Sequence, residues 1–266
     1  MELLVSLMLK LAKGPRVANT DDVVVRLDHN TGNITKFSTS AASPRIFGGN
    51  STPETAYTLP YWIKINNNNA AEGSLWFNEH ARNKIARFIP SNMTLIEYWI
   101  PTQDRQWGLC PPQTIAKDCG IANALQFSAG GKNNQEIWFT EWSENKIGRL
   151  NGEENLPVLV SISNAQAETT IKKGQPIEVK VDLKALSNNN TSINMLSAGP
   201  FTHNGALGNS TGVFSEQSFV LKPGESKQVS FIFTPAADLK SGQYMLMVGA
   251  DTGPVSILRA VKINVI

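Results

Sequence analysis

The chain of 266 residues has few cysteines and histidines, little charge and no long apolar run. Its two cysteines have no histidine nearby, so a zinc site built on them would lack two ligands. Twenty-four basic and 22 acidic residues give a net charge of +2 without a run of like charges, so no nucleic-acid-binding surface is expected. No stretch approaches about 18 consecutive apolar residues, and a transmembrane helix is not predicted.

Charged residues make up 17% of the chain, too few for a coiled coil or a charge-driven disordered protein, whereas apolar residues at 41% suffice for a packed core. The sequence is rich in glycine, proline and asparagine, which favour turns. Short runs of valine, isoleucine and aromatic residues lie between these turns. Many short strands are therefore expected, and the chain is predicted to be all-β.

Internal repetition is the strongest signal in the first half of the sequence. Residues 75–88 and 137–150 share the pattern Trp-Phe-x-Glu followed by Asn-Lys-Ile-x-Arg, and residues 24–37 match the second half of the unit. Strands are predicted at 61–66, 74–79, 84–89 and 94–100, and then at 121–127, 136–141 and 146–150. Four consecutive antiparallel strands per repeat describe a β-propeller blade. The last repeat lacks a fourth strand, for which residues 156–163 are a candidate.

The pattern changes after residue 154. Residues 177–183 and 229–233 alternate between apolar and polar side chains, and glycine-containing turns separate about seven strands. This is the size and pattern of an immunoglobulin-like sandwich without a core disulfide. We therefore expect two domains, propeller repeats at 1–154 and a sandwich at 155–266, the latter typical of spacer or adhesive modules.

Two features indicate export. Cys110 and Cys119 lie in one loop and are expected to form a disulfide, with two free thiols as the alternative. Six Asn-x-Ser/Thr sequons are present, a mild excess over chance that predicts a glycoprotein. The apolar segment 1–11 lacks the marks of a signal peptide. It is either a degenerate strand or an internal start within a longer reading frame, and as a strand it could pair with an open blade edge.

The repeated motif, followed by a Thr-Gly-Asn-Ile-Thr-Lys-Phe segment, resembles the streptogramin B (virginiamycin B) lyase family over residues 20–151. The resemblance implies a seven-bladed propeller that uses magnesium to open a cyclic depsipeptide by elimination. In that family, the base is a histidine in a Glu-Pro-His-Gly-Ile segment. The glutamate of this segment and a glutamate after Trp-Phe help to hold the metal.

The family's catalytic residues are not matched here. Cys119 stands at the histidine position and Lys117 at the glutamate position, while the preceding repeat has Tyr61 at the histidine position. Glu79 and Glu141 match the glutamate after Trp-Phe and are the only metal ligands that the resemblance implies. No catalytic residue is therefore assigned and no cofactor is expected, whereas a lyase would require magnesium.

Two long insertions, residues 38–59 and 101–118, each join the outer strand of one expected blade to the inner strand of the next. They would open on a single face, and long loops on a rigid scaffold often carry binding sites. Alternatively, the loops only cover exposed blade edges. The candidate binding residues on this rim are Tyr57, Tyr61, Trp62, Arg105 and Trp107.

The sequence thus predicts an all-β protein made of a partial, open β-propeller of two to three blades and an immunoglobulin-like β-sandwich. We expect an extracellular or cell-surface protein that binds a protein or a glycan, and that could self-associate through its open blade edges. An open arc should also expose the flat apolar faces of its first and last blades, with substantial apolar surface at its N-terminal end. The alternative is a magnesium-dependent carbon–oxygen lyase or related propeller hydrolase whose active residues lie on further blades upstream.

Overall fold

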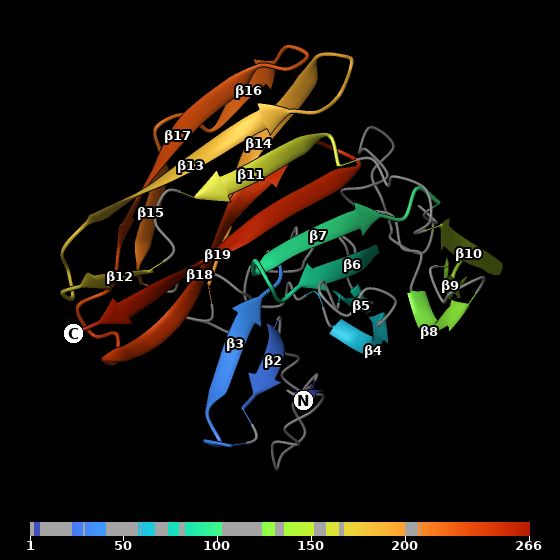
Figure 1. Cartoon of the computed structure of the whole chain (residues 1–266), viewed down its shortest axis with the longest axis horizontal. Coiled ribbons are helices and arrows are strands. Elements are labelled where there is room, and N and C mark those ends of the chain that lie inside the picture. Colours follow the sequence, from blue (N-terminus) through green and yellow to red (C-terminus); the bar gives the residue numbers. More distant parts are fainter. Residues whose placement is uncertain are drawn as a thin grey trace.

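The computed structural model describes residues 3–5, 23–28, 30–40, 58, 60–66, 74–79, 83–102, 124–130, 136–151, 158–164, 168–199, 207 and 209–266. Every regular element within these residues is a β-strand, which confirms the all-β class (Figure 1). The described part of the chain accordingly holds no helix long and apolar enough to cross a membrane.

The repeats in the first half of the chain form three antiparallel units. The first is the sheet β1-β2-β3, in which the N-terminal segment pairs with β2 as expected of a strand. The second is the meander β4-β5-β6-β7, and the third is the sheet β8-β9-β10. Their strands are β1 Leu3–Val5, β2 Val23–Leu27, β3 Ile34–Ser38, β4 Pro60–Asn66, β5 Ser74–Glu79, β6 Lys84–Ile89, β7 Thr94–Trp99, β8 Ala124–Gly130, β9 Glu136–Glu141 and β10 Lys146–Asn151.

The second half of the chain is a β-sandwich. One sheet has the order β11-β13-β17-β15, and the opposing strands run β16-β14-β18-β19. Their side-by-side order corresponds to that of an immunoglobulin-type sandwich. The first sheet matches strands A-B-E-D, and β14-β18-β19 match strands C-F-G, with β16 and β12 added at the edges. The strands are β11 Val160–Asn164, β12 Glu168–Ile171, β13 Ile177–Ala185, β14 Thr191–Ala198, β15 Thr211–Phe214, β16 Ser218–Leu221, β17 Ser226–Thr234, β18 Gly242–Asp251 and β19 Val255–Val265.

One hydrogen-bonded sheet links the two halves of the chain. Residues Val255–Arg259 of β19 pair antiparallel with Thr94–Tyr98 of β7, so that β4–β7 continue the sandwich sheet (Figure 1). The other end of β19 pairs with β12. Because both ends of β19 have a neighbour, neither leaves an unpaired edge open to aggregation.

This long sheet has a hydrophobic core on each of its two faces. On one face, Leu246 and Val248 pack with the opposing sandwich sheet, and the same core extends to Trp76 and Ile137 of the repeats. On the other face, Met245 and Met247 pack with a second set of repeat residues, drawn from β2, β3 and β5–β7. The second core consists of Val24, Phe37, Leu75, Phe77, Ala86, Phe88, Leu95, Ala198, Met245, Met247, Leu258 and Ala260.

Most of the predicted strands are found within one or two residues of their expected bounds, but two expectations need correction. The inner strand expected at 121–127 is Ala124–Gly130. The segment 156–163 does not complete the third repeat, because Val160–Asn164 pairs with β13 and places Val160 in the sandwich core. Among the described residues, β10 has β9 as its only strand partner.

Candidate functional site

The candidate site is the rim where the two long insertions leave the repeats. The first insertion connects β3 to β4 and the second connects β7 to β8, as the repeat pattern predicts. Tyr57, Arg105 and Trp107 lie outside the described residues, as do Cys110 and Cys119 of the expected disulfide. The structure therefore defines the rim through the bases of the loops.

The first insertion is fixed at its base by Glu97, a buried residue of β7. The backbone N–H of Ser40 donates to Oε1 of Glu97 at 2.8 Å, and the Ser40 hydroxyl donates to Oε2 at 2.5 Å. Hydrogen bonds to an ionised carboxylate are shorter and stronger than neutral ones. The chain is thus held where it leaves β3, two residues beyond the last strand residue.

Lys84 of β6 completes this buried cluster. Its ammonium donates to Oε2 of Glu97 and to Oγ of Ser40, both at 2.6 Å, and lies 4.6 Å from the centroid of the Trp99 ring. Burial opposes ionisation of Glu97, but the charge of Lys84 and the hydrogen bonds from Lys84 and Ser40 outweigh it and lower the pKa of the carboxyl group. Glu97 is therefore an anion paired with a cation.

A serine beside a lysine is also the arrangement of a nucleophile and its base, but the geometry here argues against that use. A general base must accept the proton of its nucleophile, whereas here Lys84 donates to Ser40 Oγ and the Ser40 hydroxyl donates to Glu97. Both side chains of the pair are at most 1% exposed, so neither faces a substrate. We assign the cluster a structural role, in which it holds the base of the first loop.

Two further hydrogen bonds fix the loop bases. The hydroxyls of Thr39 and Thr58 lie 2.5 Å apart and join the two ends of the first insertion. At the second insertion, the Thr102 hydroxyl donates to Oε2 of Glu141 in β9. Each loop thus leaves its repeat next to a carboxylate of the sheet, which fixes the chain where the loop begins.

Both inner strands are irregular where they begin at this rim. The register of β4 against β5 shifts between Pro60 and Ile63, and that of β8 against β9 shifts between Ala124 and Phe127. Irregularities of this kind reorient side chains and are common next to functional sites. Trp62 lies within the first one, with its backbone N–H donating to Oδ1 of Asn78 at 2.7 Å and its side chain 44% exposed. For Tyr61, only its backbone place in β4 is described.

The two carboxylates matched to the family's metal ligand are both buried. Glu79, in β5, has 0% exposure, and Glu141 accepts the hydrogen bond from Thr102. Within the described residues, no group of three histidine, cysteine or acidic side chains is close enough to hold a metal ion. Glu79 and Glu141 therefore lie buried within their strands.

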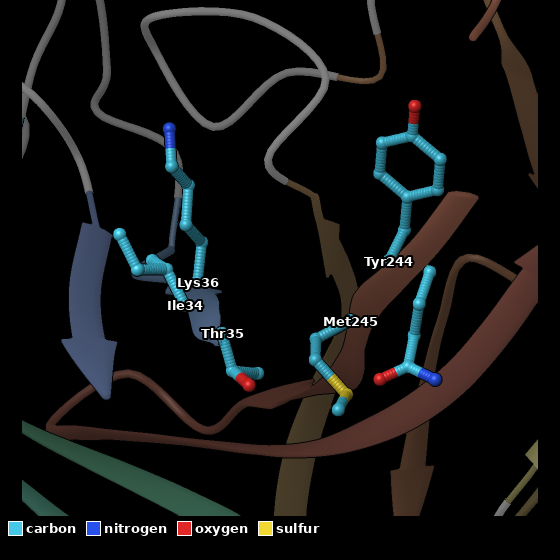
Figure 2. Close-up of a pocket in the computed structure, with 6 residues that line it drawn as sticks. Ile34, Thr35, Lys36, Tyr244 and Met245 are labelled. Carbon is cyan, nitrogen blue, oxygen red and sulfur yellow. The ribbon is translucent and has the colours of Figure 1, made fainter. Parts of the chain in front are cut away.

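A cavity of about 400 Å³ lies away from this rim, where the start of β3 meets β18. Figure 2 shows Lys36 and Tyr244 on opposite sides of it, pointing the same way, with Thr35 and Met245 turned to the other side. The Tyr244 hydroxyl donates to the Lys240 carbonyl at 2.7 Å, and burial raises its pKa. The described residues that line the cavity are Ile34, Thr35, Lys36, Gln243, Tyr244 and Met245.

Sequence reasoning did not find the Lys84–Glu97–Ser40 cluster. The available signal was Glu97, a charged residue in the middle of the largely apolar strand Thr94–Trp99. Lys146 occupies the position of Lys84 in the third repeat, yet its side chain is 52% exposed and pairs with Glu144. The motif therefore predicts where the lysine lies in its strand. Whether the lysine is buried depends on the fourth strand of the repeat.

No family model and no curated protein matches the sequence. Similar solved structures include an ASH/PapD-like domain of human CEP192, at 16% identity over 42% of this chain and 90% of that chain, with a TM-score of 0.32. Domains 4 and 5 of the S-layer protein SbsC match at 16% identity over 49% of this chain and 65% of that chain (TM-score 0.28). The Salmonella enterica SafA pilin–SafB chaperone complex matches at 11% identity over 41% of this chain and 56% of that chain (TM-score 0.29). With TM-scores this low, the sandwich is assigned here from the chain's own strand order.

Proposed function

We propose that the chain is an exported or cell-surface binding protein in which blade-like repeats carry a ligand-binding rim and the sandwich supports them. The observation that carries this proposal is the fixed base of both long loops. Ser40 is held by Glu97, and Thr102 is held by Glu141. A loop that is anchored at its base loses less conformational entropy on binding than an unanchored one.

The packing of the repeats supports an open propeller arc. Phe37 of the first repeat and Phe88 of the second are in contact, with ring centroids 4.8 Å apart. On its other face, the second repeat shares a buried cluster with Ile137 and Phe139 of the third. Successive sheets thus stack face to face in chain order, as propeller blades do.

Two observations favour binding over catalysis. Glu79 and Glu141 are buried within the sheets, and Lys117 and Cys119 stand in the sequence where the resembled family has a carboxylate and a base. A buried carboxylate that cannot reach a substrate does not take part in proton transfer. If magnesium has no site here, millimolar magnesium should leave the melting temperature unchanged, because a ligand shifts stability only by binding the folded state.

Surface features support export. Five of the six sequon asparagines are among the described residues, and all five are exposed, as attachment of a glycan requires. They are Asn33, Asn92, Asn189, Asn190 and Asn209.

A glycan array tests the binding role, because the exposed ring of Trp62 on the rim offers a large, rigid contact surface. Fluorescently labelled full-length chain should bind a subset of the printed glycans. Trp62→Ala should lower that signal at least tenfold, whereas Leu186→Ala, which removes an exposed apolar side chain of the sandwich, should not. Absence of binding to any printed glycan, or equal loss in both variants, would overturn the glycan-binding role.

A parallel assay tests the enzyme alternative. The chain is incubated with a streptogramin B depsipeptide and magnesium, and the product is analysed by chromatography, because elimination gives a linear isomer of unchanged mass. We expect the cyclic compound to persist. Ring opening that depends on magnesium and is lost in Glu141→Gln would establish a lyase and refute the binding-only assignment.

A further inference from the structure

The outer face of the third repeat exposes large side chains on the strands that the structure describes. On β9, Trp138 is 39% exposed, and on β10, Ile147 is 72% exposed. Arg149 lies directly opposite Trp138 in the strand register, and Ser128 of β8 lies opposite Trp138 on the other side. We call this surface, made of Ser128, Glu136, Trp138, Thr140, Ile147 and Arg149, the terminal face. Figure 1 shows β8–β10 at one end of the molecule.

The equivalent face of the second repeat is buried. Trp76 and Ile85 occupy the positions of Trp138 and Ile147 in the repeat, and they are 2% and 1% exposed. Both belong to the core cluster that contains Ile137 and Phe139 of the third repeat, and β8 packs beside β4 and β5. This surface of the second repeat is thus buried because the sheet of the next repeat packs on it.

The same contact between an arginine and a tryptophan occurs on both faces. The Arg87 guanidinium lies 5.5 Å from the Trp76 ring centroid, and that of Arg149 lies 5.7 Å from the Trp138 ring centroid. On the terminal face, Glu136 accepts from the indole N–H of Trp138 at 3.0 Å and pairs with Arg149 at 3.4 Å. The terminal face therefore has the ordered side chains of a stacking surface before anything stacks on it.

We propose that the terminal face is a dimer interface, where it packs against the terminal face of a second copy of this chain. The face is self-complementary, because a two-fold axis would set Arg149 of each copy against Glu136 of the other, around an apolar centre of Trp138 and Ile147. Two-fold interfaces of this kind are the commonest in soluble oligomers. The proposal rests on the equivalence of the repeats and is independent of the ligand-binding rim.

Sedimentation velocity of the full chain over a range of concentrations tests the interface. The wild type should form a dimer, and Ile147→Lys should raise the dissociation constant at least tenfold by placing an ammonium in the apolar centre. Val213→Lys on β15 is the matched control, because Val213 is 65% exposed on the sandwich, far from the terminal face in the strand order. It should leave the dimer unchanged. A wild type that stays monomeric at all concentrations, or a control that dissociates equally, would overturn the proposal.

Charge reversal tests the two-fold pairing. Arg149→Glu alone and Glu136→Lys alone should each weaken the dimer, because each sets like charges against one another in both contacts. An equimolar mixture of the two variants should recover a heterodimer, because both contacts then join opposite charges. As a control, Lys227→Glu, at an exposed ion pair of the sandwich, should not affect association. If the mixture fails to associate while the wild type does, a two-fold pairing through these residues is wrong.

Discussion

The ammonium of Lys84 lies 2.6 Å from Oε2 of Glu97, on neighbouring strands and out of contact with solvent. Ser40, at the base of the first long loop, is bound to both partners. This places two opposite charges between the first and second repeats, next to a core of apolar side chains. Each charge is tolerated there only because the other is present.

Removal of one partner should therefore cost more than removal of both. Glu97→Gln leaves the buried Lys84 ammonium without a counter-charge and should destabilise the fold by about 3–5 kcal/mol. The double variant Lys84→Met/Glu97→Leu should be more stable than Glu97→Gln. Urea unfolding measures the free energy of unfolding of both variants.

Glu216→Gln, at the exposed pair with Lys227, is the control and should cost less than about 1 kcal/mol because solvent screens that pair. Equal losses in Glu97→Gln and the control would contradict the buried pairing.

The same pair predicts an acid-sensitive contribution to stability. The pKa of Glu97 is lowered in the folded state from its ordinary value of 4.5, so the stabilisation is complete above pH 4.5. Below that pH the unfolded chain takes up the proton first, and the stabilisation is lost as the pH falls toward the folded-state pKa. The difference in unfolding free energy between wild type and Glu97→Gln should thus narrow on acidification below pH 4.5. A difference that does not change with pH would show that folding leaves the pKa of Glu97 unshifted.

Much of the fold follows from local sequence pattern. The alternation at 177–183 specifies a strand and the face that it buries, and the repeated Trp-Phe-x-Glu motif specifies a strand in each of two repeats; all three strands are found there. The sequence around Met245 to Val248 does not alternate, because β18 is buried on both faces. Leu246 faces one core and Met247 the other. A continuous apolar run is the sign of such a strand.

The long-range features could not be predicted in this way. The pairing of β7 with β19 joins segments more than half the chain apart, and nothing in either strand's local pattern specifies its partner. For the same reason, the segment 156–163 is a candidate for the fourth strand of the third repeat by its sequence, whereas β11 belongs to the sandwich. By contrast, an open arc is expected to expose apolar side chains on its first and last blades. Ile34 is exposed in the first repeat, and Trp138, Trp142 and Ile147 are exposed in the third.

The close contact of β18 with β19 predicts a strict requirement for glycine at residue 249. A Cβ on Gly249 would meet the carbonyl oxygen of Ile257 and lie 2.6 Å from Cα of Leu258. Both are backbone atoms, which cannot rotate away, so Gly249→Ala should cost about 3 kcal/mol or more. Gly224→Ala, at a turn with φ +73° and open space around it, should cost about 1 kcal/mol. Thermal unfolding of the two variants measures the difference, and a reversed order would contradict the packing.

The expected disulfide between Cys110 and Cys119 is testable in solution. Native protein recovered from an oxidising compartment should show no reactive thiol until a reductant is added. Closing this short loop should contribute about 2–3 kcal/mol by restricting the unfolded chain. Cys110→Ser/Cys119→Ser should then unfold at a correspondingly lower urea concentration. Two alkylatable thiols in the unreduced native protein would contradict the prediction.

The shared sheet and second core predict that the two halves of the chain fold as one unit. In residues 155–266 alone, the face that carries Met245, Met247 and Leu258 would lose its cover from the repeats. Apolar patches of that kind bind hydrophobic dyes and promote aggregation. We expect the full chain to unfold in a single calorimetric transition with little dye bound, and the fragment to bind the dye strongly.

In the fragment, Met247→Lys should reduce dye binding, whereas Val213→Lys, outside the second core, should not. Two separate transitions in the full chain, or a fragment that is monomeric and does not bind the dye, would show that the halves are independent.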